Sequence, residues 1–192
     1  TARGYAFAAA LGLAQFVLNF NFVYRAEQFI TSGLVAVVFA LLLIPNSLFG
    51  RIFLGQRLGR QLVIGSAIAM AGVALLFVHE IRSDPKGPTA SLVGIGLTLC
   101  AILSASSANV MQGTEVARAY PMLRTTAIAM LLGGAFDAAW AWMTVGAPVM
   151  EWRLGYIAGI LYLGIFASAL AFPLYFGVIR IIAVSYTHLT LP

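Results

Sequence analysis

The chain has 192 residues, of which 61% are hydrophobic and 9% are charged, and it carries a net charge of +5. Soluble domains contain about 25% charged residues, so this composition indicates a protein that resides in a lipid bilayer. The basic residues lie singly between apolar runs and not along one face, which argues against nucleic acid as a partner. The single cysteine, Cys100, lies inside an apolar run and excludes a disulfide framework.

Six apolar runs are each long enough to cross a membrane as a helix, because about 20 helical residues span the hydrocarbon core. We expect these spans at residues 4–24, 27–49, 61–79, 90–113, 123–146 and 155–177, and a seventh that begins at Val178. The sequence lacks the alternation of apolar and polar residues that is typical of membrane β-barrels. Lipid offers no hydrogen bonds to unpaired backbone N–H and C=O groups, so the spans must be helices. The expected fold class is all-α, a polytopic transmembrane helix bundle with six full spans and the start of a seventh.

The charges between the spans support this count. One side of the membrane then carries seven basic residues and one acid, namely Arg3, Arg51, Arg57, Arg60, Arg118, Arg124 and Arg180 with Glu115. The opposite side is balanced, with Arg25, Arg82, Lys86 and Arg153 against Glu27, Glu80, Asp84 and Glu151. Cytoplasmic loops carry an excess of Arg and Lys, so the first side is predicted to be cytoplasmic.

Residues 32–75 read SGLVAVVFALLLIPNSLFGRIFLGQRLGRQLVIGSAIAMAGVAL and resemble the EamA-type repeat of the drug/metabolite transporter superfamily. The resemblance rests on a proline near the end of one span, a short basic loop and a glycine-rich next span: Pro45, residues 51–60, Gly65, Gly72 and Val73. Residues 163–172 and 178–181 resemble the penultimate stretch of the same family. A weak internal repeat at an offset of 152 residues aligns Phe20 with Phe172 and Ile30 with Ile182.

The resemblance implies a ten-helix fold of two five-helix repeats that are inverted relative to each other in the membrane. By that template the chain is a fragment that lacks the first two and the last two helices. Residues 1–80 would end the first repeat with three spans, and residues 81–90 would form the inter-repeat loop. Residues 91–183 would then begin the second repeat, with three spans and the start of a fourth.

Two segments depart from the family pattern. The chain reads Leu54-Gly55-Gln56 where family members commonly have Leu-Gly-Glu, so an ion pair made by that glutamate is not expected here. Residues 184–192, VSYTHLTLP, match the translation of a transposon-end sequencing adapter, so we expect the natural sequence to stop near Ala183. The chain also begins at Thr1 without a methionine or a signal peptide, which is expected of a fragment.

Asp137 is the strongest candidate for chemistry, because an acid in the middle of a span is costly and needs a partner or water. It lies in the sequence GGAFDAAWAW of the fifth span. One interpretation is a carboxylate that couples transport to a proton, with a pKa raised by burial. The alternative is an acid that holds helices together through a hydrogen bond.

Amide and aromatic side chains are candidates for a substrate cavity. Gln15 and Asn19 lie four residues apart in the first span and predict one polar face, which Phe22 extends. Asn109 and Gln112 do the same at the end of the fourth span. Such amides bind polar solutes and serve equally well as hydrogen bonds between helices. Aromatic residues that could stack on a solute complete the list, namely Trp140, Tyr162 and Tyr175.

The resemblance implies a secondary transporter, most simply an exporter of small metabolites or drug-like solutes, that works by alternating access in the inner membrane. Its partners would be a small solute and the bilayer, and the oligomeric state stays open. No hydrolase, metal or phosphate-loop motif occurs in the sequence, so no enzyme, cofactor or metal is expected. A membrane scaffold or assembly subunit built on the same helices is the alternative, and it predicts polar residues that face packed neighbours.

Overall fold

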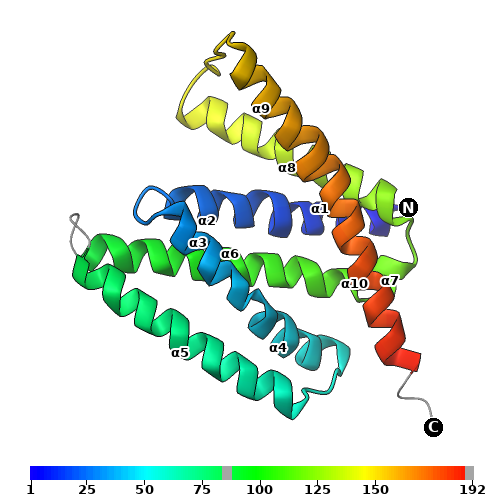
Figure 1. The fold of residues 1–192 in the computed structure, drawn as a ribbon. Helices are drawn as coiled ribbons and strands as arrows, with labels where there is room; N and C mark the ends of the chain where they lie inside the picture. The colour runs from blue at the N-terminus through cyan, green and yellow to red at the C-terminus, as the bar shows by residue number, and fades with distance from the viewer. Residues whose placement is uncertain (84–87, 189–192) are drawn as a thin grey trace. The chain divides into compact units, whose positions relative to one another are not determined.

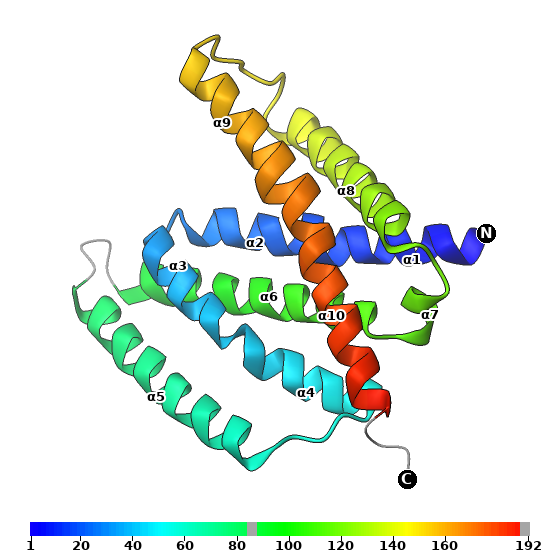
Figure 2. The same ribbon diagram turned by 45° about the vertical axis from the view of Figure 1, so that its right-hand side comes forward.

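The computed structural model describes the backbone of residues 1–83 and 88–188, most of which is helical. Side chains are described for the same residues except 80, 83 and 182–188. The helices in chain order are α1 (Ala2–Gly12), η1 (Leu13–Leu18), α2 (Asn19–Ala26), α3 (Ser32–Phe39), η2 (Ala40–Leu42), α4 (Leu43–Leu54), α5 (Arg60–Ser83), α6 (Pro88–Gln112), α7 (Glu115–Arg118), α8 (Met122–Thr144), α9 (Leu154–Gly164), η3 (Ile165–Leu170) and α10 (Ala171–His188). Figures 1 and 2 show them in two views.

Six membrane spans are confirmed, since six helices of the described chain are long and apolar enough to cross a bilayer. They run over Ala2–Ala26, Ser32–Leu54, Arg60–His79, Pro88–Gln112, Met122–Thr144 and Leu154–Ile181. The second span begins five residues later than expected, because Thr31 caps the helix by accepting a hydrogen bond from the backbone N–H of Leu34 at 3.4 Å. The residues from Val178 onward extend the sixth span as part of α10 instead of starting a separate helix.

The connection between the third and fourth spans is shorter than the sequence indicates. The expected loop at residues 81–90 narrows from both sides, since α5 continues to Ser83 and α6 starts at Pro88; residues 84–87 between them lie outside the described residues. Within the expected tail, the backbone of residues 184–188 continues α10, and residues 189–192 lie outside the described residues. The loop after α4 starts at Gly55, whose φ of +67° is the left-handed conformation that ends a helix at little cost to glycine.

The chain forms two compact units, one of residues 1–17 with 111–192 and the other of residues 18–110. The second unit has an apolar core that α2, the following turn, α3, α5 and α6 build together. Its buried members are Ala26, Ile30, Leu34, Val35, Val38, Val73 and Ile102. Gly94 lets α6 approach this core, because a Cβ there would lie 2.7 Å from Ile30 Cγ2. Small residues permit such close helix contacts in membranes.

The first unit is organised by the crossing of α1 and α8. A Cβ on Gly12 would lie 2.6 Å from the carbonyl oxygen of Ala129, and a Cβ on Gly133 would lie 2.8 Å from Phe16 Cβ. The two backbones therefore approach as closely as glycine permits. Phe16, in η1, also meets Phe172 of α10 edge to face, with ring centroids 4.9 Å apart. This contact packs α10 against η1.

One pattern of secondary structure occurs twice in the chain. An α-helix gives way to a six-residue π-helical segment and then returns to α-helix, first in α1, η1 and α2 and again in α9, η3 and α10. The second copy begins 152 residues after the first, and its inner boundaries keep this offset, at which Phe20 aligns with Phe172, while α10 continues beyond the counterpart of the end of α2. Proline is not the cause, since Pro173 follows η3 whereas its counterpart after η1 is Asn21. In Figures 1 and 2 the second copy forms one continuous rod.

Candidate functional site

Asn46 and Asn109 form a polar contact in the second unit. Asn109, on α6, is buried, and its amide nitrogen donates to Asn46 Oδ1 on α4 at 3.3 Å. Asn46 follows Pro45 directly, and the 3₁₀ turn η2 lies just before that proline, where the missing N–H weakens the helix. Asn109 is a predicted site residue and Asn46 is not, although an amide beside a proline inside a span is a signal of the same kind.

Further buried polar atoms lie in the same unit. Ser106 is fully buried one turn before Asn109 on α6, and its hydroxyl has no hydrogen-bond partner among the described residues. Asn19 begins α2, is 4% exposed, and its Oδ1 likewise lacks a described partner. Other hydroxyls of α6 differ, because Thr98, Ser104 and Ser107 each donate to the carbonyl four residues earlier at 2.8 Å. Ser106 and Asn19 thus differ from these hydroxyls in having a buried oxygen without a described partner.

Gln112 and Arg180 form the most connected polar contact in the first unit. Arg180 Nε donates to Gln112 Oε1 at 2.9 Å, and Arg180 Nη1 donates to the carbonyl oxygen of Tyr120 at 3.2 Å. Gln112 is fully buried and Arg180 is partly buried. The charge count treats Arg180 as a loop residue, whereas the structure places it at the end of the sixth span with two protein partners.

Gln15 lies in the π-helical segment η1 of the first unit. Its side chain is 5% exposed, and its Oε1 has no partner among the described residues. A π-helical turn is rare and occurs frequently at functional sites in helices. Gln15 thus keeps the features expected of a solute-binding amide, a buried position and a free acceptor.

Asp137 lies on α8, one turn beyond the crossing at Gly133, and its side chain is partly exposed. The aromatic candidates near it in sequence or on α9 and α10 lie at the surface: Trp140 is 46% exposed, Tyr162 61% and Tyr175 41%. The ring of Tyr162 stacks on that of Phe166, in η3, with centroids 5.7 Å apart. The ring centroids of Tyr175 and Phe176 are 5.8 Å apart. Phe22, on α2, is partly buried.

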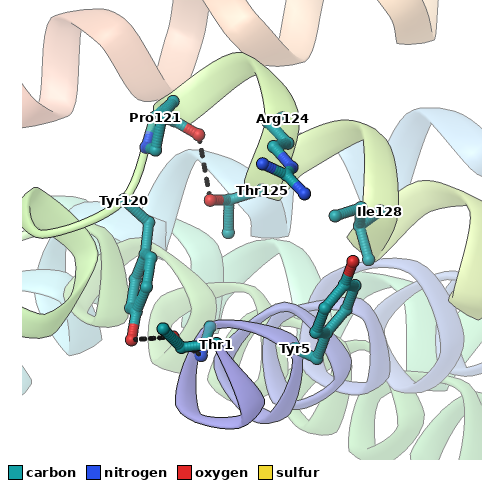
Figure 3. A pocket seen from close by; sticks show the side chains of 8 residues that line it. Thr1, Tyr5, Tyr120, Pro121, Arg124, Thr125 and Ile128 are labelled. Carbon is teal, nitrogen blue, oxygen red and sulfur yellow. Dashed lines mark hydrogen bonds between the residues drawn. The ribbon is translucent and has the colours of Figure 1, made fainter.

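A cavity of about 60 Å³ opens beside Tyr120 in the first unit, and Figure 3 shows its lining. The residues around it are Thr1, Gly4, Tyr5, Tyr120, Pro121, Arg124, Thr125 and Ile128. The Thr1 and Tyr120 hydroxyls are 3.0 Å apart, and Thr125 donates to the carbonyl of Pro121 at 3.0 Å. Sites for drug-sized ligands measure about 300–1,000 Å³. This cavity has room for water and does not include the residues that the sequence analysis selected.

Metal chemistry has no site in the described part of the chain, where no three His, Cys, Asp or Glu side chains come together. The site candidates are thus amides, hydroxyls, one carboxylate and one guanidinium, and they divide between the two units. Amides in both units are buried, whereas the aromatic candidates Trp140, Tyr162 and Tyr175 are exposed.

Comparison with known proteins gives one match. Residues 1–78 match the EamA-like transporter family. No curated protein and no solved structure matches the chain. The resemblance predicted from residues 32–75 is thereby confirmed for the first part of the chain.

Proposed function

We propose, from the match of residues 1–78 to the EamA-like transporter family, that this multi-pass membrane protein is a secondary transporter. It would move small metabolites or drug-like solutes across the inner membrane by alternating access, most simply outward. The protein would carry no catalytic centre, and its coupling ion would be a proton.

The repeated helix–π–helix pattern is the observation that carries the proposal. It occurs in the first and the sixth of the six spans. Successive spans cross the membrane in opposite directions, so the first and the sixth span, which have four spans between them, run in opposite directions. The two copies are therefore related by inverted topology, which is typical of carriers whose substrate site lies between two such repeats. The family match ends at residue 78, which supports residues 1–80 as the end of the first repeat and residues 91–183 as the start of the second.

The substrate class follows from the buried polar groups. Gln15, Asn19, Asn109 and Gln112 are each no more than 5% exposed, and their amides offer both donors and acceptors without a charge. Asn109 and Gln112 already bind Asn46 and Arg180. The side-chain oxygens of Gln15 and Asn19 have no partner among the described residues, and burying them is costly unless they bind something. Within each unit such amides favour a polar solute with amide, hydroxyl or carbonyl groups, and Phe22, in the second unit, would contact the apolar part of a solute bound there.

Asp137 is the proposed proton-coupling residue, and it can be tested in the intact protein reconstituted in liposomes. A pH gradient is imposed and proton flux is followed with an internal dye while amino acids and amphipathic drugs are added one at a time. Asp137→Asn keeps the shape of the side chain and removes its proton site, so we expect solute-dependent flux to disappear. Glu151→Gln is the matched control, since Glu151 is an exposed loop acid that pairs with Arg153.

Each result has a definite meaning. Flux that survives Asp137→Asn would keep the transporter and remove Asp137 from its coupling. If no solute moves protons, labelled-solute uptake is the next measurement, and its absence would contradict transport and favour the scaffold hypothesis.

A further inference from the structure

Arg180 places a guanidinium charge at the end of a membrane-spanning helix without a counter-ion that the structure describes. Its two hydrogen-bond acceptors, Gln112 Oε1 and the Tyr120 carbonyl, are both neutral. The ion pair found among the described residues joins Glu151 and Arg153, in the loop before α9. A charge withdrawn from water without an opposite charge is costly, so the environment of Arg180 favours an anion.

Two N–H donors of this contact lack an acceptor. Arg180 Nη2 and Gln112 Nε2 are both buried and have no hydrogen-bond partner among the described residues. In a guanidinium, Nε and Nη2 lie on one edge of the planar fork. Because Nε binds Gln112 Oε1, Nη2 lies on the edge that faces the Gln112 amide. Burying an unsatisfied donor is costly, and here both residues of one contact carry such a donor.

The chemistry of these atoms defines the occupant. Arginine is a donor only, and the remaining atom of the Gln112 amide is also a donor, so the occupant must accept hydrogen bonds from both. Water would satisfy the donors and leave the charge uncompensated, whereas an oxyanion does both and forms the stronger, charge-assisted bonds. Arg118, whose Nη2 donates to the Gly113 carbonyl at 3.4 Å, adds positive potential one residue from Gln112.

We propose that Gln112 and Arg180 bind one oxyanion, a carboxylate or phosphate group, at the predicted cytoplasmic end of the first unit. A soluble organic anion and the headgroup of an anionic lipid both present this group at that level of the membrane. The site adjoins the cavity beside Tyr120, since the Tyr120 carbonyl accepts from Arg180, and binding of an anion there does not depend on transport. Its test is therefore a binding measurement, which can succeed or fail whether or not the protein moves a solute.

The test uses the intact protein in neutral detergent, with thermal unfolding as the readout. One arm titrates inorganic phosphate against sodium chloride of equal ionic strength, and the other adds phosphatidylglycerol against phosphatidylcholine. Arg180→Gln removes the charge and keeps a donor, and we expect it to weaken binding of the active anion at least tenfold. Arg57→Gln makes the same charge change in an exposed loop of the other unit and should leave the response as it is.

Gln112→Glu gives a second, independent result. This isosteric change places a carboxylate against Arg180 in the position of the proposed anion, so the variant should unfold at a higher temperature without added anion and lose its response to it. A response to phosphate identifies a soluble anion, and a response to phosphatidylglycerol alone identifies a lipid headgroup. The proposal is overturned if neither stabilises the wild type, or if Arg57→Gln loses the response as fully as Arg180→Gln.

Discussion

The two adjacent glycines of α8 provide a matched test of the helix crossing in the first unit. A Cβ at Gly133 would lie 2.8 Å from Phe16 Cβ and 3.3 Å from the Gly12 carbonyl oxygen, whereas a Cβ at Gly134 would meet nothing within 4 Å. Ordinary contacts begin at 3.4 Å, and the atom in the way is a Cβ that cannot rotate aside. Gly133→Ala therefore requires α1 to move away from α8.

The expected effect can be worked out because the two variants share one term. Replacing glycine by alanine inside a helix gains up to about 1 kcal/mol at either position, so this gain cancels in the comparison. What remains is the overpacking at Gly133, which typically costs about 1–3 kcal/mol. For a chain of this size a loss of 1 kcal/mol lowers Tm by about 2–4 °C. We expect Gly133→Ala to unfold about 2–12 °C below Gly134→Ala.

Thermal unfolding of the purified protein in mild detergent measures this difference directly. Gly12→Ala should behave like Gly133→Ala, since its Cβ would lie 2.6 Å from the Ala129 carbonyl oxygen on the same crossing. Equal unfolding temperatures for Gly133→Ala and Gly134→Ala would show that α1 and α8 do not cross at these glycines.

Two further predictions concern the second unit. Asn46→Leu and Asn109→Leu should each destabilise the protein, and their double-mutant cycle should give a coupling energy of about 0.6–1.7 kcal/mol, the range of hydrogen bonds between membrane helices; zero coupling would contradict the bond. Gly55→Ala should cost about 1–2 kcal/mol in chemical or thermal unfolding, because alanine is strained at a φ of +67°. Gly59→Ala in the same loop, which has open space around it, is the control and should be close to neutral.

The number and approximate position of the spans could be predicted from sequence because both depend on composition over some 20 residues. The hydrocarbon core imposes that length on any spanning helix. Apolar runs separated by short charged connections are therefore a sufficient signal for the spans. Ends of helices are less predictable, as the second span shows. Residues 27–31 read EQFIT and adjoin an apolar run, so hydropathy alone does not show where the second span begins. In the structure Thr31 caps that span and Ile30 is buried in the turn before it.

The partners of polar residues could not be predicted, since they come from distant parts of the chain. Gln112 and Arg180 are 68 residues apart, and Asn46 and Asn109 are 63 apart. Charge counting also assigns every arginine near a span end to a loop, which is why Arg180 was not recognised as a side chain with protein partners. For the aromatic candidates, sequence alone does not distinguish a residue that faces a cavity from one that faces lipid, and Trp140 and Tyr162 are exposed.

The π-helical segments could not be predicted from sequence patterns either, because their sequences, LAQFVL and IFASAL, share little beyond apolar character. Their common position, with Gly12 and Gly164 directly before them, indicates a constraint on the backbone and not on particular side chains. A π turn widens a helix and leaves local carbonyls less well bonded, which occurs frequently where helices carry function. In the first copy this segment contains the buried Gln15. In the proposed inverted arrangement the two irregular turns would belong to oppositely directed spans, as expected if a solute site is shared by both repeats.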